Sequence, residues 1–170
     1  MKSGNELKLM LGKIGENPPQ SEFTNIINLN IKKTNFPIFD LIATKDNEIY
    51  AFSAKARMRY SSDLENLYYN ILTGGYENVS RKFRKALDLF TEMEYDINKI
   101  HYCFLICPFE ENKDCVYYWC EFTDIKEHCS MANILEKKIK FLSVPVSDKN
   151  LKNYKIYGIW NWEHIKNTYL

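Results

Sequence analysis

The sequence has little that would place the chain in a membrane or give it a strong overall electrostatic field. Its longest apolar runs reach about eight residues, which is too short to cross a bilayer. Residues 1–11 lack a clean apolar segment with a cleavage site, so we expect no signal peptide. The formal net charge is only +1. Any surface for a polyanion must therefore be a local patch.

Several familiar motifs are also missing. The chain contains no Cys-x-x-Cys pair and only three histidines, which makes a zinc site a weak candidate. Gly74-Gly75 fits neither the P-loop nor the dinucleotide-binding pattern. The five cysteines are odd in number and cluster in apolar, strand-like stretches. This usage favours reduced, buried thiols and an intracellular protein, either cytoplasmic or nuclear.

What the sequence does contain is typical of a globular domain. Of its 170 residues, 45% are hydrophobic and 26% are charged, and this length favours one domain over residues 1–170. Apolar spacing predicts a first helix over Ser3–Gly15, with Ser3 and Glu6 in a capping box. It also predicts helices over Ser61–Leu72 and Asn78–Glu94, a short helix near 124–135, and a helix or tail over 161–170.

Strand-like segments fill the remainder of the chain. Residues 23–31 read as a first strand, and Phe36–Arg59 reads as a hairpin with Asp46-Asn47 at its turn. The nearly continuous apolar run Ile100–Cys107 is typical of a central strand with both faces covered. Further strands are expected at Cys115–Phe122, Lys138–Val146 and Lys155–Trp160. The order α-β-β-β-α-α-β-β-α-β-β predicts a mixed α/β domain.

The hairpin gathers the residues that could carry chemistry. A turn at Asp46-Asn47 places Asp40 opposite Ser53, with Lys55 on the same face and diagonal to Asp40. The opposite face is a predicted core face, made by Phe39, Leu41, Ala43, Tyr50, Phe52 and Ala54. A carboxylate, a hydroxyl and a lysine that converge at a strand end can hold a divalent ion and activate a water. The alternative is an ordinary half-exposed hairpin that carries a cross-strand charge pair.

The same residues resemble a known superfamily. Phe39-Asp40-Leu41-Ile42-Ala43 followed by Ala51-Phe52-Ser53-Ala54-Lys55-Ala56-Arg57 is similar to the PD-(D/E)XK nucleases. The nearest likeness is to the small Holliday-junction-resolvase-like, restriction-endonuclease-like branch. The resemblance implies an α/β fold with an αβββαβ core and a mixed central sheet over about residues 1–107, followed by a C-terminal β-rich elaboration over about 108–170. It also implies a Mg²⁺-dependent (or Mn²⁺-dependent) endonuclease that acts on DNA.

The resemblance further assigns roles to individual residues. Asp40 matches the first metal-binding acid and Lys55 the catalytic lysine. Ser53 stands where the second acid belongs, and would serve only as a hydrogen-bonding group at the attacking water. A hydroxyl supplies no charge to Mg²⁺, so either another acid completes the site, or the metal affinity is weak, or catalysis has been lost. Glu6 on the first helix is the candidate, although its capping role explains it equally well.

A local excess of positive charge follows the hairpin and supports nucleic-acid binding. The cations that could meet phosphates are Arg57, Arg59, Arg81, Lys82, Arg84 and Lys85. Many small nucleases act as symmetric dimers, so a homodimer is a further expected partner. Two alternatives stay open. One is an inactive protein of the same fold that binds nucleic acid or a protein. The other is an interaction module, in which the hairpin is purely structural and the aromatic C-terminal half binds a protein partner. Core packing or a subunit interface explains the aromatic residues of that half better than base stacking does; they are Tyr117, Tyr118, Trp119, Tyr157, Trp160 and Trp162.

Overall fold

A computed structural model describes residues 2–59, 68–72, 76–125, 130–136, 139 and 142–170. The elements are, in chain order, α1 Gly4–Glu16, β1 Thr24–Asn28, α2 Leu29–Lys32, β2 Leu41–Lys45, β3 Glu48–Met58, β4 Tyr68–Leu72, α3 Tyr76–Glu92, β5 Ile100–Phe109, β6 Cys115–Glu121, α4 Phe122–Ile125, α5 Met131–Leu135, β7 Leu142–Pro145, α6 Asp148–Leu151, β8 Lys155–Trp160 and α7 Trp162–Tyr169. The chain is therefore a mixed α/β protein, as its sequence predicts. None of the helices in the described ranges is long and apolar enough to span a membrane.

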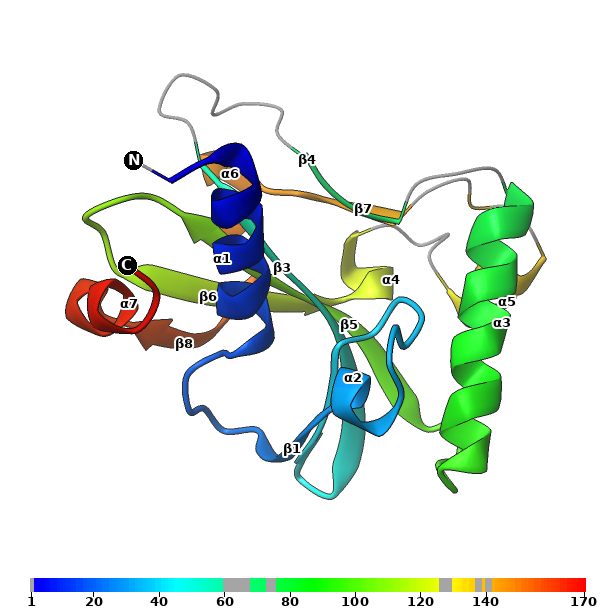
Figure 1. Cartoon of the computed structure of the whole chain (residues 1–170). Helices are drawn as coiled ribbons and strands as arrows, with labels where there is room; N and C mark the ends of the chain where they lie inside the picture. The colour runs from blue at the N-terminus through cyan, green and yellow to red at the C-terminus, as the bar shows by residue number, and fades with distance from the viewer. Residues whose placement is uncertain (1, 60–67, 73–75, 126–129, 137–138, 140–141) are drawn as a thin grey trace.

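A six-stranded mixed sheet forms the centre of the structure, in the order β1-β2-β3-β5-β6-β8 (Figure 1). Strands β3 and β5 are parallel neighbours, and every other pair in this sheet is antiparallel. A parallel pair needs a crossover connection, and α3 lies in the segment that joins β3 to β5. Strands β4 and β7 form a separate antiparallel pair.

The β2–β3 hairpin has the predicted register. Asp46 and Asn47 form the turn with φ values of 51° and 64°, which these two residue types tolerate. Pairing runs from Lys45 opposite Glu48 to Leu41 opposite Phe52. One step further, the Asp40 amide donates to the Phe52 carbonyl at 2.9 Å. Phe52 therefore meets both Leu41 and Asp40. The predicted register is confirmed from Lys45 and Glu48 to Leu41 and Phe52, but Asp40 and Ser53 are not a pair of this ladder.

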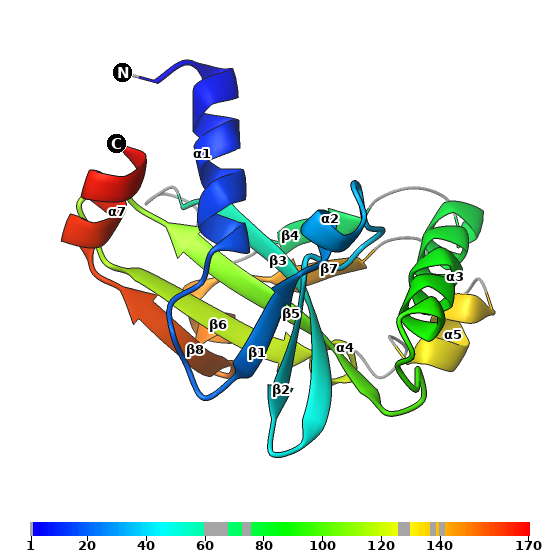
Figure 2. The same cartoon turned by 60° about the horizontal axis from the view of Figure 1, so that its bottom comes forward.

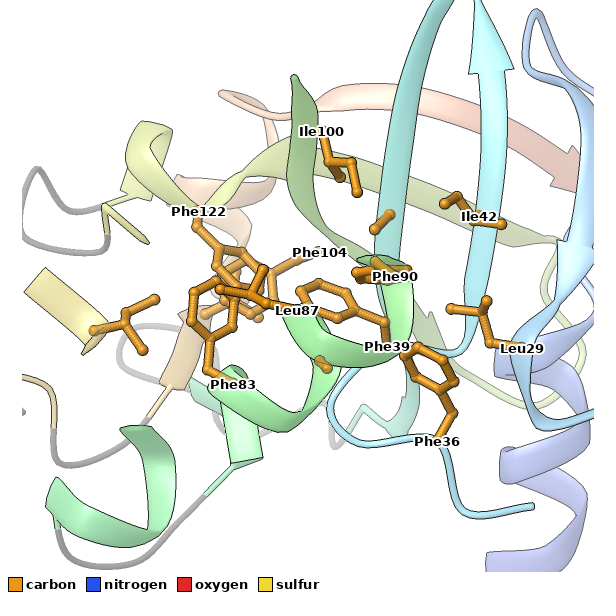
Figure 3. Close-up of a cluster of buried hydrophobic side chains, with 14 of the residues drawn as sticks. Leu29, Phe36, Phe39, Ile42, Phe83, Leu87, Phe90, Ile100, Phe104 and Phe122 are labelled. Carbon is orange, nitrogen blue, oxygen red and sulfur yellow. The ribbon is translucent and has the colours of Figure 1, made fainter. Parts of the chain in front are cut away.

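Both faces of this hairpin are buried, which differs from the prediction of one core face and one partly polar face. The α1-side core combines Met10 and Ile14 of α1 with Leu41 and Phe52 of the hairpin. The α3-side core lies on the other face and is shown in Figure 3; it includes Leu29, Phe36, Phe39, Ile42, Ala51, Phe83, Leu87, Phe90, Ile100, Phe104 and Phe122. The sheet continues on both sides of β3 and helices cover both of its faces, so only the end of the strand is left for polar residues.

The local predictions agree with most of the structure. The Ser3–Glu6 capping box is present at the start of α1, and α3, β5, β6 and β8 form where the sequence places them. The predicted strand 23–31 is too long. Its last part forms α2, because the Asn28 side chain accepts from the Asn30 amide and caps a short helix.

Two other predictions need correction. The predicted helix Ser61–Leu72 is wrong over Tyr68–Leu72, which form β4 and pair with β7; residues 61–67 lie outside the described part. The segment has helical apolar spacing, but a strand partner far along the chain outweighs that local signal. The predicted strand 138–146 is shorter, at Leu142–Pro145, and belongs to this two-stranded pair rather than to the central sheet.

Candidate functional site

Asp40 is held between two elements by its backbone. Its amide donates to the Phe52 carbonyl of β3, and its carbonyl accepts from the Leu29 amide of α2, both at 2.9 Å. Since both backbone polar groups are paired, the position of the residue is fixed by the sheet and not by its side chain. This anchoring places the carboxylate at the point where β2 begins.

The turn before Asp40 is strained. Ile38 has a φ of 65°, which is a true outlier for a β-branched residue. The Phe39 amide donates to the Pro37 carbonyl at 2.7 Å and closes a three-residue turn around Ile38. Such a conformation costs about 1–3 kcal/mol and persists only where the surroundings hold it. The turn sends Phe39 into the α3-side core, so Phe39 does not share a face with Leu41 as the simple alternation predicts.

Hydrogen bonds and burial together define the state of the Asp40 carboxyl group. Oδ2 accepts from the Ala54 amide at 2.8 Å, and Oδ1 accepts a long 3.5 Å bond from the Asn30 side-chain amide. Burial raises the pKa of Asp40 to about 6, and the nearby Glu16 carboxylate acts in the same direction. The Ala54 amide, Lys55 and Asn30 oppose this rise in pKa. A cation that binds here would therefore relieve an unfavourable negative charge.

This carboxyl group opens into a polar cleft of about 770 Å³. The cleft lies where the end of α1, the short helix α2 and the helix α3 come together, and Figure 2 shows α2 between the other two helices. Its titratable side chains are two carboxylates and four cations: Glu16, Asp40, Lys55, Arg81, Lys82 and Lys85. The net charge of this lining is positive, which suits a phosphate-bearing ligand.

The predicted basic residues divide into two groups. Arg81, Lys82 and Lys85 line the cleft, because spacings of three and four residues put them on one side of α3. Arg84 is exposed but does not belong to the cleft lining.

Two other predicted cations lie beyond Lys55 along the chain, outside the cleft lining. The Arg57 guanidinium donates to the Ala56 carbonyl at 3.0 Å, and the Arg59 amide donates to the Phe109 carbonyl at 2.8 Å. The structure therefore brings Lys55 and three of the six predicted phosphate contacts to Asp40.

Glu16, and not Glu6, is the second carboxylate of the cleft. Glu6 accepts from the Ser3 amide at 2.9 Å, as a capping residue. It lies ten residues before Glu16 along α1, a rise of about 15 Å. The cap therefore accounts for Glu6, and the helix length keeps it from Asp40.

A close helix–strand approach explains how Glu16 reaches the cleft. A Cβ on Gly15 would stand 3.0 Å from the Ala56 nitrogen, so the absence of a side chain lets the last turn of α1 lie against β3 beside Lys55. The sequence predicts only that Gly15 ends the first helix, and this prediction does not reveal its contact with β3. The signal in the sequence was an acid directly after a glycine at the predicted end of the first helix.

Ser53 is on the predicted face but is not in the cleft. Its side chain is fully buried, and its hydroxyl donates to the Ile38 carbonyl at 2.8 Å. This bond ties the strained turn to β3. The structure therefore gives Ser53 a part in positioning Asp40, rather than the contact with an attacking water that the sequence suggested.

The cleft provides two acids that suit a hard cation. Mg²⁺ is commonly held by one or two carboxylates together with substrate phosphates, and the partly exposed Asp40 and Glu16 match that requirement. Within the described ranges, no three His, Cys, Asp or Glu side chains form a metal-binding group. Cys103, Cys107, Cys115 and Cys120 are buried free thiols, as predicted.

Comparison with known proteins finds no matching family model, no matching curated protein and no matching solved structure. Any functional conclusion about this chain therefore depends on the geometry of the site and on the resemblance of its hairpin.

Proposed function

We propose that this chain is a metal-dependent endonuclease that hydrolyses phosphodiester bonds in DNA. The observation that supports it is the single cleft in which Asp40 and Glu16 meet Lys55 and the basic side of α3. The order α1-β1-β2-β3-α3-β5, with α2 and β4 inserted, agrees with the αβββαβ core implied by the resemblance. Asp40 and Lys55, which the resemblance matches to an acid and a lysine, both line this cleft.

Each residue has a distinct task in this proposal. Asp40 and Glu16 would hold Mg²⁺ or Mn²⁺, which, when bound, polarises the phosphodiester and lowers the pKa of water. Lys55 orients the attacking water or stabilises the negative charge that develops on the phosphoryl oxygens. Arg81, Lys82 and Lys85 bind neighbouring phosphates and position the strand. The Ser53 hydroxyl keeps the turn before Asp40 in place.

One observation favours a second candidate, an inactive protein of the same fold that binds nucleic acid. The position where the resemblance expects a second acid holds Ser53, which is buried and bonded to Ile38. The two carboxylates of the cleft supply only a modest negative charge for binding a catalytic ion. The basic side of the cleft would still bind phosphates without cleaving them.

A cleavage assay separates these candidates. Purified protein is incubated with supercoiled, linear and branched DNA in Mg²⁺ or Mn²⁺, beside the variants Asp40→Asn and Lys55→Ala. Lys113→Ala is the matched control, because Lys113 pairs with Glu110 at the turn after β5, outside the cleft. We expect the first two variants to lose cleavage and the control to keep it.

The other outcomes are equally informative. Cleavage that survives both Asp40→Asn and Lys55→Ala would refute the assignment. Binding without cleavage would support the inactive candidate. A protein that neither binds nor cuts any of these substrates would overturn both candidates and leave a protein-interaction module.

A further inference from the structure

A second groove, of about 410 Å³, adjoins the cleft. Its aromatic lining comes from Trp160 at the end of β8 and from His164 and Tyr169 of α7. Glu16 lines both the groove and the cleft. The last residue of α1 is therefore shared by the two recesses. In Figures 1 and 2 this end of α1 lies between α7 and α2.

The aromatic wall of the groove is held in place before any ligand arrives. The rings of Trp160 and His164 are stacked, with centroids 3.7 Å apart and an interplanar angle of 15°. The Trp160 indole N–H donates to the Asn17 carbonyl at 2.9 Å. Asn161 accepts from the His164 amide at 2.8 Å and caps α7. A preorganised aromatic surface loses little conformational entropy when a flat ligand binds to it.

The opposite wall is apolar and open to solvent. Ile26 of β1 is 42% exposed and Ile31 of α2 is 83% exposed, and both line the groove. Neighbouring residues of the same segments line the two recesses. Asn30 lines the cleft and Ile31 the groove, just as Asp40 lines the cleft and Leu41 the groove. A ligand that reaches from one recess to the other would present a charged group to the cleft and a flat apolar group to the groove.

We propose that this groove binds an unpaired nucleobase of a strand whose phosphate lies in the cleft, an inference that rests on the proposed function. A nucleotide has the required shape, a flat ring joined to a phosphate. Every base has a π-face that can stack on an aromatic side chain. A base inside an intact duplex is already stacked and paired, so it has no free face to offer. The favoured substrates are therefore DNA strands with unpaired nucleotides, such as branched, flapped or single-stranded DNA.

A binding experiment without divalent ions tests the groove by itself. Labelled oligonucleotides are titrated by fluorescence anisotropy in three forms: an intact duplex, the same duplex with one unpaired nucleotide, and that duplex with an abasic residue at the unpaired position. We expect Trp160→Ala to weaken binding of the unpaired form about 5- to 100-fold. Trp160→Phe, which keeps a stacking ring, is expected to bind nearly as the parent does. Duplex and abasic binding should change less than about twofold, because no base stacks on the ring.

A second pair of variants keeps the test valid if Trp160→Ala does not fold. Ile31→Ser removes an exposed wall of the groove and should weaken binding of the unpaired form about threefold. Leu9→Ser is its control, because Leu9 is also exposed, at 67%, and lies on α1 outside the groove.

Two outcomes would overturn the inference. One is equal affinity of the parent for the unpaired and abasic forms. The other is a loss with Trp160→Ala that is the same for all three forms. The experiments distinguish a failure of the groove inference from a failure of the nuclease proposal. Asp40-dependent cleavage with no effect of Trp160→Ala would refute the groove alone. Trp160-dependent binding without cleavage would refute the nuclease alone.

Discussion

Replacing Asp40 with asparagine should make the protein more stable at neutral pH, although we expect the same change to abolish cleavage. Burial raises the pKa of this carboxyl group from 3.8 to about 6. The folded protein therefore binds the proton more tightly than the unfolded chain does. The stability that this group contributes is complete below pH 3.8 and is lost as the pH rises through 6. An asparagine has no titrating proton and stays neutral at every pH, so the variant escapes that loss.

The size of the effect follows from the shift in the pKa of Asp40. At 1.36 kcal/mol for each pH unit, the full titration amounts to about 3 kcal/mol. Roughly 2 kcal/mol of this falls between pH 4.5 and 7. Because part of the carboxyl group opens to water in the cleft, we expect a measured gain of about 1–2 kcal/mol over that interval. The Ala54 amide keeps an acceptor in the variant, since the asparagine side chain also has a carbonyl oxygen.

Urea unfolding of the parent and of Asp40→Asn, followed by tryptophan fluorescence from pH 4.5 to 8 without divalent ions, measures this difference. The difference in the free energy of unfolding should grow with pH and level off above about pH 7. Asp88→Asn is the control, because Asp88 is exposed on α3, and its difference from the parent should stay nearly constant. A difference for Asp40→Asn that does not change with pH, or that favours the parent at pH 7, would refute the reasoning.

Three further predictions concern the surroundings of Asp40. In α1, Gly15→Ala should destabilise the protein by about 1–3 kcal/mol through overpacking against β3. Gly12→Ala is its control and should stabilise the protein by about 0.5–1 kcal/mol, because a Cβ at Gly12 meets nothing within 4 Å. Equal effects of the two variants in urea unfolding would contradict the close approach of α1 to β3. Ser53→Ala should lower the free energy of unfolding by about 1–3 kcal/mol, because it removes the donor to the Ile38 carbonyl. Ser53→Glu should lower it further without improving metal binding. Stronger metal binding by Ser53→Glu would show that this position faces the cleft. Mn²⁺ should raise the thermal midpoint of the parent by an amount equivalent to about 2.7 kcal/mol at 100 times its Kd. It should raise the thermal midpoint of Glu16→Gln much less. An equal rise in the two proteins would exclude Glu16 from the proposed ion site.

A half-buried acid with a raised pKa is a feature that stability alone does not explain. Ionised Asp40 is unfavourable where it lies, and the turn before it holds Ile38 at a positive φ. Strained backbone and perturbed pKa values often occur together at functional sites, where the surrounding structure supports both. The hydrogen bond from Ser53 and the anchored backbone of Asp40 are that support here.

Features that depend on near neighbours in the chain were predictable from the residues alone. The Asp46-Asn47 turn and the register that follows from it need only two residues that tolerate positive φ. The capping box of α1 involves positions three apart, and α3 and β5 are long enough for their apolar patterns to be unambiguous. From these, the pairing of the hairpin from Lys45 and Glu48 to Leu41 and Phe52 follows directly. The irregular step at Asp40 does not, because it depends on the turn at Ile38.

Contacts between distant segments were not encoded in any local pattern. The apolar spacing near Tyr68 predicts a helix, but this segment forms a strand that pairs with β7. The alternation predicts that Phe39 shares a face with Leu41, but the turn at Ile38 sends Phe39 to the other face. Glu16 enters the cleft because Gly15 packs against Ala56, forty-one residues later in the chain. The residue types of the hairpin therefore suggest the proposed chemistry, whereas long-range packing determines that Glu16 is the second acid of the cleft and that Ser53 is buried. That packing depends on the shape of the whole core, which no short stretch of sequence specifies.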